Sequence, residues 1–508
     1  MQPPSVGQEP DAIRPPSLLD ALVPLGSLVL LIGGSLLLFG LDALDGPVQV
    51  ALILCTMVAA LIAMKNGYTW AHVERAAQGS MASIASAILI LLSVGALIGV
   101  WCLSGTIPTL VYYGIQILSP GWYYAATAVI CGVVALSIGS SWTTAGTIGV
   151  GLVGIATALG VSPEITAGAV VSGAYLGDKL SPLSETTIMA SQLVEADVHE
   201  HIKRQAWTSV PAFAIAVGVF LLLGLGAGPE VDDAVPTTVE LDALDGVYNI
   251  TPVNLLPLVL LAVLSVRKVP ATLALLAATL FGGVVGAFTQ PDIVRGFVDE
   301  ERGPVLDSIT AVWQAAGTGF SIDTGVAEID GLVSRGGMSS MLLTVWLIIG
   351  AVTFGALLDE MGLLARLIDP LIAAARSTGR LFATVLGCAL GLNIVAGDQY
   401  IALVLPTRLF RSEFARRRLH PTMLSRLTAD SGTVTSPLVP WNSCGAFMSA
   451  VLGVSTLLYL PYAVFNIVSP LLSVVYGATG FTIEKVAPAG VVAGVDDRAG
   501  TDPAREEA

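Results

Sequence analysis

The sequence predicts an all-α polytopic membrane protein with about 11 to 13 transmembrane helices, an inverted-topology repeat, and re-entrant or broken helices. Of its 508 residues, 54% are hydrophobic and only 12% are charged. A soluble domain carries roughly 25% charged residues. Several uncharged apolar runs reach the roughly 20 residues that cross about 30 Å of hydrocarbon. The runs are 25–40, 48–64, 84–103, 125–138, 212–228, 255–266, 271–288, 341–358, 381–392 and 457–475.

The chain ends and the basic residues predict how the chain enters the membrane. Residues 1–20 are polar and rich in proline, and no small-residue cleavage site follows, so 25–40 is predicted to be a first span rather than a signal peptide. Basic residues mark cytoplasmic flanks, and they are densest at 416–418. The acidic stretches 42–45 and 230–245 lack Lys and Arg and should lie outside. This pattern places the N-terminus inside.

Two parts of the chain repeat each other. Residues 79–83 (GSMAS) resemble 336–340 (GGMSS), and Ser181-Pro182-Leu183 recurs as Ser436-Pro437-Leu438 at nearly the same offset. The first copy follows a basic flank and so enters from inside, whereas the second follows the acidic stretch 292–330 and enters from outside. Inverted repeats are common in secondary transporters. The absence of a G-x-x-x-x-G-K-[ST] motif argues against an ATP-driven pump.

Four polar segments interrupt the apolar sequence, one pair in each copy: 139–146, 177–187, 392–399 and 430–442. Bare backbone cannot face lipid, because unsatisfied N–H and C=O groups cost several kcal/mol each. Pro182, Pro437 and Pro440 also lack an N–H donor and cannot continue a helix smoothly. We therefore expect discontinuous helices whose broken ends meet near the midplane. Free carbonyls and hydroxyls there can bind a cation, and helix N-termini can bind an anion.

The breaks contain five ionisable residues, which are costly at membrane depth and usually functional. Each has a structural alternative. Asp178 and Lys179 could pair with each other or cap a re-entrant loop. Glu185 could lie in a cytoplasmic vestibule, and Asp430 could cap a helix beside a basic loop. Asp398 lies between apolar segments on both sides and has the weakest structural explanation.

These features divide the chain into six predicted parts. They are a disordered tail (1–20), N-terminal transmembrane helices (21–66), a first transport repeat with the spans that follow it (67–288), an acidic external loop (289–337), a second, inverted transport repeat (338–480) and a disordered acidic tail (481–508).

Several functions are excluded. The net charge is −15 and no basic patch lies outside the membrane flanks, so we expect no nucleic-acid partner. The five Cys lie in or beside apolar runs and suit neither a metal site nor a disulfide framework. The four His flank basic loops and should be solvated. No hydrolase motif occurs, so we expect neither an enzyme nor a cofactor.

The segment 173–187, which contains GDKLSPLSETT, resembles the NhaC family of sodium/proton antiporters. Residues 319–338, 397–400 and 430–442 support the resemblance, which extends from the first span to Tyr476. It implies inverted repeats with paired re-entrant hairpins in the cytoplasmic membrane, and exchange of Na⁺ for H⁺. It also implies a set of ion- or substrate-binding residues, namely Asp178, Ser181, Ser184, Glu185, Thr186, Asn393, Asp398, Thr433, Ser436 and Asn442.

A carboxylate in a partly dehydrated site can hold a proton or, together with hydroxyls and carbonyls, a Na⁺ ion. If both ions need the same carboxylate, alternating access yields exchange. We expect Asp398 and Asp178 to be the carrier carboxylates. The expected oxygen ligands are Ser181, Thr433, Ser436 and Asn442. The partners are then Na⁺, H⁺ and the lipid bilayer, and a homodimer is left open.

The rival interpretation is an ion-coupled antiporter of an organic acid or amino acid, such as malate/lactate or arginine/ornithine. Relatives of similar sequence exchange such substrates, and Lys179 with the helix N-termini could then hold a carboxylate. A channel or a membrane scaffold is a further alternative. A channel would carry far faster currents, and a scaffold would tolerate replacement of every intramembrane carboxylate.

Overall fold

The computed structural model describes residues 13–226, 244–298, 302–324, 330–331 and 333–486. The elements of this part are helical, and the single isolated β-bridge found in it joins Leu419 to Lys485. Eight of its helices are long and apolar enough to span a membrane, or nine if a pair bent by 93° at Gly453–Ser455 counts as one span. The predicted membrane-helical fold is confirmed. The expected number of about 11 to 13 spans is higher than these eight or nine. Broken helices account for the difference, because they are too short or too polar to count as uninterrupted spans.

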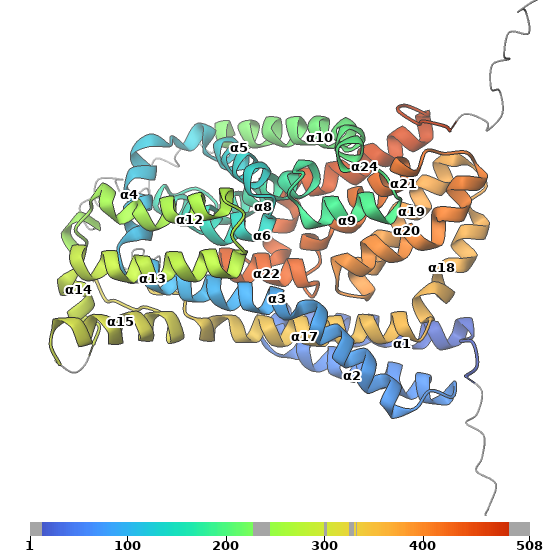
Figure 1. The fold of residues 1–508 in the computed structure, drawn as a ribbon, viewed down its shortest axis with the longest axis horizontal. Helices are drawn as coiled ribbons and strands as arrows, with labels where there is room; N and C mark the ends of the chain where they lie inside the picture. The colour runs from blue at the N-terminus through green and yellow to red at the C-terminus, as the bar shows by residue number, and fades with distance from the viewer. Residues whose placement is uncertain (1–12, 227–243, 299–301, 325–329, 332, 487–508) are drawn as a thin grey trace, which may run out of the picture.

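The elongated molecule in Figure 1 has its helices running mostly along one axis. Helices α1 (Leu18–Phe39), α2 (Pro47–Lys65), α3 (Trp70–Leu103) and α17 (Leu342–Glu360) pack together on one side. Helix α1 begins where Ser17 and Asp20 form a capping box, which satisfies free N–H groups at its N-terminus. The helix therefore extends into the predicted N-terminal tail.

The first repeat forms a hairpin followed by a broken helix. Helix α5 (Pro120–Ile138) ends at Gly139, and the chain returns through α6 (Ser141–Thr144), the π-helix η2 (Ala145–Gly149) and α7 (Val150–Ala158). The Tyr123 hydroxyl donates to the Leu152 carbonyl, which joins the two arms. Helix α8 (Pro163–Leu180) then runs beside α5, and after a break comes α9 (Glu185–Leu193).

The second repeat follows the same path. Helix α19 (Thr378–Val395) ends in a break, and α20 (Gln399–Arg416) returns to the end where α19 began. There the Arg417 guanidinium donates to the Ala375 carbonyl. The broken helix consists of α21 (Pro421–Thr428), the π-helix η5 (Ala429–Thr433), the 3₁₀ helix η6 (Ser436–Leu438) and α22 (Ser443–Leu452).

Backbone conformation supports the repeat more strongly than the short sequence matches. Residues with a positive φ recur at almost the same offset along the two copies, and each follows the end of a helix or helical segment. Such a conformation is uncommon for residues other than glycine. The pairs, with φ in degrees, are Gly105 (73) and Gly362 (70), Gly139 (79) and Gly397 (64), Gly160 (64) and Arg418 (57), and Glu195 (57) and Gly453 (70).

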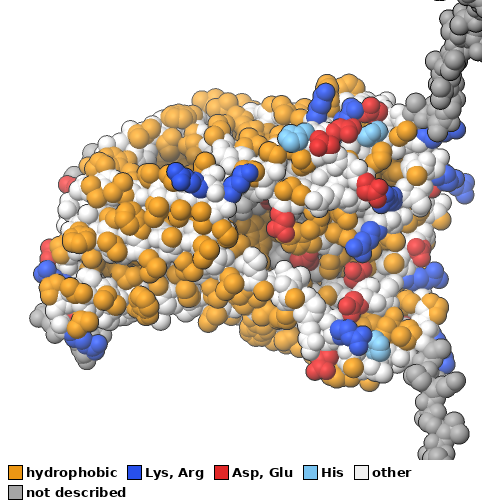
Figure 2. All heavy atoms as spheres, in the orientation of Figure 1, with side chains coloured by type: hydrophobic (Ala, Val, Ile, Leu, Met, Phe, Trp, Pro, Cys, Tyr) orange, Lys and Arg blue, Asp and Glu red, His pale blue; other side chains and the backbone are white. Residues whose placement is uncertain are grey.

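The outer ends of the two hairpins lie at opposite ends of the molecule. Helix α7 packs on α4 (Thr106–Ile117), at the left end of Figure 1, whereas α20 and α21 meet at the right end. An ion pair of 2.7 Å between Glu195 and Arg411 places the far end of the first broken helix beside the second hairpin. Figure 2 shows many of the visible Lys and Arg side chains at this right end, and a largely hydrophobic surface elsewhere.

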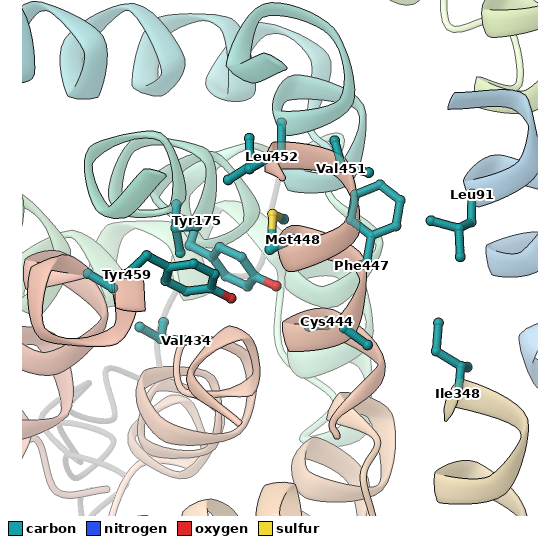
Figure 3. Close-up of a cluster of buried hydrophobic side chains, with 14 of the residues drawn as sticks. Leu91, Tyr175, Ile348, Val434, Cys444, Phe447, Met448, Val451, Leu452 and Tyr459 are labelled. Atoms are coloured by element: carbon teal, nitrogen blue, oxygen red, sulfur yellow. The ribbon is translucent and has the colours of Figure 1, made fainter. Parts of the chain in front are cut away.

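Where the halves meet, a buried cluster joins α22 to α8, α3 and α17. Figure 3 shows Tyr175 of α8 and Phe447 of α22 in this cluster, with Leu91 and Ile348 facing them from α3 and α17. The Tyr459 hydroxyl donates to the Pro437 carbonyl over 2.6 Å. Close packing of this kind fixes the breaks relative to one another.

The remaining helices complete the bundle. Segment 289–337, predicted as an external loop, contains α14 (Pro291–Gly296) and α15 (Pro304–Thr318) in its described part. Most of the predicted C-terminal tail and the greater part of 230–245 lie outside the described residues. The other elements are α10 (Val198–Gly226), α12 (Leu256–Val266), α13 (Ala271–Thr289), α18 (Leu363–Ala374), α23 (Thr456–Tyr459), α24 (Val464–Thr479), η1 (Gly40–Asp45), η3 (Pro252–Leu255), η4 (Met338–Met341) and η7 (Leu460–Tyr462).

Candidate functional site

A cavity of about 560 Å³ lies where breaks from both repeats meet. Its acidic lining residues are Asp178, Glu185 and Asp398, and Lys268 is its basic lining residue. Its walls come from α3, both breaks of the first repeat, the loop between α12 and α13, and the start of α20. Figure 2 shows a hollow near the centre of one face, with acidic side chains beside it. The cavity therefore brings together carboxylates that are far apart in the sequence.

Asp178, near the C-terminal end of α8, is held by the first hairpin. Its carboxylate accepts hydrogen bonds from the Ser141 backbone N–H (3.1 Å) and from the Ser141 hydroxyl. Its backbone carbonyl accepts bonds from the hydroxyls of Thr186 (3.2 Å) and Thr187 (2.6 Å) across the break. The side chain is only 7% exposed, so these contacts replace much of its water.

Asp398 is the N-cap of α20. One oxygen accepts bonds from the backbone N–H groups of Tyr400 (2.7 Å) and Ile401 (3.1 Å). The positive end of the helix dipole stabilises a negative charge at this position. The residue is 5% exposed and faces the cavity, so it is a buried carboxylate whose charge the protein backbone stabilises.

Three further predicted residues line the same cavity. Ser184 is buried, and its hydroxyl lies 3.0 Å from that of Thr186 and 3.5 Å from a carboxylate oxygen of Asp178. Glu185 is exposed, in agreement with the vestibule that was its structural alternative. Asp178, Ser184, Glu185, Thr186 and Asp398 thus share one space.

The other five predicted residues do not line this cavity; most of them shape the breaks. Ser181 accepts a bond from the Leu183 N–H (3.3 Å), and Ser436 donates to the Thr433 carbonyl (2.7 Å). Asn442 caps α22 and donates to Asn393 Oδ1 over 3.1 Å, while Asn393 donates to the Gly432 carbonyl over 2.7 Å. Whether any of them binds an ion stays a prediction.

Lys179 and Asp430 form a fully buried ion pair with each other, away from the cavity. Two of the structural alternatives were therefore wrong: Lys179 does not pair with Asp178, and Asp430 lies inside a π-helix rather than at an N-cap. His201 is also buried, beside the Ser425 hydroxyl at 2.9 Å, so the expectation that all four His are solvated was wrong.

Among the lining residues that sequence reasoning did not name, Ser141 and Lys268 matter most for the chemistry of the cavity. Ser141 lies in a recognised polar break, but nothing in the sequence showed that this break meets Asp178. Lys268 lines the cavity and has a left-handed backbone with a φ of 59°. Its place after an apolar run indicated only a cytoplasmic flank.

A protein-family model described as the Na⁺/H⁺ antiporter family matches residues 19–207 and 174–481. This chain belongs to the Na⁺/H⁺ antiporter family. The predicted resemblance is confirmed, and so are the assignments of a transporter rather than an enzyme and of a multi-pass protein of the cytoplasmic membrane. The fold described above is therefore that of a secondary antiporter.

Relatives of this antiporter are named for different substrates. It is 36% identical to the Na⁺/H⁺ antiporter NhaC of Alkalihalophilus pseudofirmus, over 86% of this chain and 91% of the relative. It is 34% identical to the malate-2H⁺/Na⁺-lactate antiporter of Bacillus subtilis, over 92% and 96%. It is also 34% identical to the arginine/ornithine antiporter ArcD of Halobacterium salinarum, over 93% and 94%.

Among solved structures, Neisseria gonorrhoeae MtrF matches with a TM-score of 0.37 and 15% identity, over 90% of this chain and 94% of that chain. A likeness at this level carries no argument about fold or substrate.

Proposed function

We propose that this antiporter exchanges Na⁺ for H⁺ at the cavity, by alternating access of one site to the two sides of the membrane. The observation that carries the proposal is the negative charge of the cavity lining. It contains three acidic residues, Asp178, Glu185 and Asp398, and one basic residue, Lys268. A concave site with an excess of negative charge concentrates cations. It disfavours an organic anion, whose carboxylate would meet the carboxylates of the protein.

The chemistry of the two buried carboxylates suits both ions. Asp178 and Asp398 are 7% and 5% exposed, and removal of water favours either protonation or a bound counter-ion over a bare charge. Na⁺ is a hard cation that prefers oxygen ligands, which the hydroxyls of Ser141, Ser184 and Thr186 can supply. Because Na⁺ and H⁺ would need the same oxygens, binding of one excludes the other.

Exchange of an organic acid or amino acid is the second candidate, since two of the relatives are named for such substrates. It was expected to use Lys179 as the partner of a substrate carboxylate. Lys179 is 1% exposed, pairs with Asp430 and does not line the cavity. It therefore cannot bind a substrate carboxylate at the cavity in this conformation. Lys268 is the basic side chain that remains at the cavity.

Flux in proteoliposomes separates the two candidates. We expect ²²Na⁺ uptake against an imposed pH gradient with no organic substrate present, and no inhibition by malate, lactate or arginine. Matched vesicles without protein give the leak. Exchange that requires one of these organic compounds, or stops when one competes, would contradict the proposal and support the second candidate.

A further inference from the structure

A second polar cluster lies away from the cavity, buried between α8, α10, α24 and the π-helix η5. Its centre is the carboxylate of Asp430, which is 0% exposed. Side-chain donors surround both carboxylate oxygens. They are Lys179 Nζ, Gln205 Nε2 (2.9 Å), Thr208 Oγ1 (3.0 Å) and Ser469 Oγ (3.1 Å) at Oδ1, and Ser473 Oγ at Oδ2.

The surroundings of the Lys179 ammonium are those of a cation-binding site. Besides Asp430, it donates to the Ser469 hydroxyl over 2.6 Å and lies 5.3 Å from the centroid of the Phe465 ring. A carboxylate, a hydroxyl oxygen and an aromatic face all attract cations. Gln205 donates its Nε2 to Asp430, and its buried Oε1 has no hydrogen-bond partner among the described residues.

Stability alone does not explain this ion pair. Replacing a buried ion pair by well-packed apolar residues is often neutral or stabilising, because both charges must be removed from water. Ionisable residues within a membrane bundle are rare and usually belong to an ion pathway or a proton relay. Hydroxyl groups of α10 and α24 are gathered around Asp430, which an isolated structural pair does not require.

We propose that Asp430 and the hydroxyl oxygens around it form a second binding site for a monovalent alkali cation, Na⁺, and that the Lys179 ammonium occupies this site in the conformation described here. The proposal rests on the proposed function in taking Na⁺ as the cation. A single carboxylate balances one positive charge, which fits a monovalent ion. Oxygen ligands suit a hard cation, for which the ammonium is a tethered substitute.

The site is linked to the cavity through the backbone of α8. Lys179 directly follows Asp178, and the two side chains reach different sites, Asp178 to Ser141 and Lys179 to Asp430. A shift of the end of α8 that withdraws the ammonium from Asp430 would also move Asp178, which this end presents to the cavity. Through this movement, a cation at Asp430 would change the cavity carboxylate without touching it.

The test removes the tethered cation and asks whether Na⁺ replaces it. Full-length protein carrying Asp178→Asn and Asp398→Asn, which removes Na⁺ binding at the cavity carboxylates, serves as the parent. Lys179→Met is added, and thermal unfolding in detergent is compared in NaCl and in choline chloride at equal ionic strength. We expect the melting temperature of the Lys179→Met protein to rise with Na⁺ concentration and then to saturate. The parent, whose ammonium fills the site, should unfold at the same temperature in both salts.

Two further variants complete the test. Lys179→Met with Asp430→Asn has no charge to balance, so its melting temperature should not depend on Na⁺. Lys179→Gln keeps a hydrogen-bonding side chain and decides the question if the Met variant does not fold. Equal melting temperatures of both Lys179 variants in the two salts, or failure of both to fold at any Na⁺ concentration, would overturn the proposal. The assay measures no flux, so its outcome is independent of whether the cavity exchanges Na⁺ for H⁺.

Discussion

At Asp178, the side chain and the backbone carbonyl are held by different segments of the first repeat. Ser141 of the hairpin binds the carboxylate, while Thr186 and Thr187 of α9 bind the carbonyl. Asp398 is instead held by N–H groups of its own helix. Relative movement of hairpin and broken helix would therefore alter the contacts of Asp178 and leave those of Asp398 unchanged.

Ser141→Ala tests whether this hairpin hydroxyl belongs to the ion site. It removes one charge-assisted contact from a desolvated carboxylate, which is worth about 1.5–3 kcal/mol. We expect the apparent Na⁺ affinity to fall roughly 10- to 100-fold, since each 1.4 kcal/mol is about tenfold. The measurement is the Na⁺ concentration dependence of uptake in proteoliposomes.

Thr144→Val is the matched control for Ser141→Ala. Its hydroxyl lies on the same short helix, is buried, and donates to the Ser140 carbonyl at 2.9 Å rather than to the cavity. Na⁺ affinity should stay within about twofold of the parent, as for a neutral contact outside the site. An equal loss in both variants would show that Ser141 acts only through the folding of α6.

At the scale of the element, the breaks depend on left-handed residues at matched positions. Gly139 and Gly397 have φ of 79° and 64°, and each precedes the N-cap of the helix that follows, Ser140 or Asp398. A Cβ atom on Gly139 would lie 2.7 Å from the Leu183 carbonyl carbon and 2.9 Å from the Ser184 nitrogen. The two breaks of the first repeat are therefore in close contact at Gly139, where there is no room for a side chain.

Gly139→Ala should lower stability and activity together. The left-handed conformation costs a residue with a side chain about 1–3 kcal/mol, and the clash with the backbone of Leu183 and Ser184 adds to this cost. Gly160→Ala provides the comparison, because its φ is 64° but a Cβ there meets nothing within 4 Å. We expect a lower melting temperature and little exchange for Gly139→Ala, and a smaller shift with exchange retained for Gly160→Ala. Equal melting temperatures and equal exchange activities of the two variants would show that the contact between the breaks contributes to neither stability nor exchange.

Apolar runs and polar breaks were sufficient to predict the membrane fold and the broken helices, and five of the ten site residues carried over from the family resemblance line the cavity. Pro182, Pro437 and the glycines around them are local signals of broken helices, so sequence alone locates them. The partners of the breaks are set by tertiary packing. Lys179 contacts Asp430 far along the chain rather than its neighbour Asp178, and no local pattern encodes that choice. The predicted 11 to 13 spans exceed the eight or nine helices of the described residues that are long and apolar enough to cross a membrane, because the broken helices are too short or too polar to be counted among these.

At the scale of the whole molecule, the outer ends of the two hairpins lie at opposite ends, with the Arg416–Arg418 cluster at one of them. By the positive-inside rule this end faces the cytoplasm, and the turn at Gly160 then faces outside. The two copies would thus be related by inversion across the membrane, which allows one central site to open alternately to the two sides.

Cysteine labelling tests this orientation. Gly160→Cys and Arg416→Cys both lie at exposed positions, at the outer ends of the two hairpins, and the five native cysteines are buried. A membrane-impermeant maleimide should label Gly160→Cys from outside only and Arg416→Cys from the cytoplasm only. Labelling of both from one side would rule out the inverted arrangement.

The most direct test of the central claim, that one carboxylate serves both ions, is made at Asp398. The measurement is Na⁺ uptake against an imposed pH gradient, from about pH 6 to 9, for the parent, Asp398→Asn and Asp398→Glu. In the parent, the apparent KM for Na⁺ should rise at low pH, where a proton holds the site, and level off at high pH. Asp398→Asn imitates the protonated form and should abolish coupled exchange, whereas Asp398→Glu should keep partial activity with a shifted pH profile. Robust proton-coupled Na⁺ uptake by Asp398→Asn would contradict the account and make Asp178 the first candidate in its place.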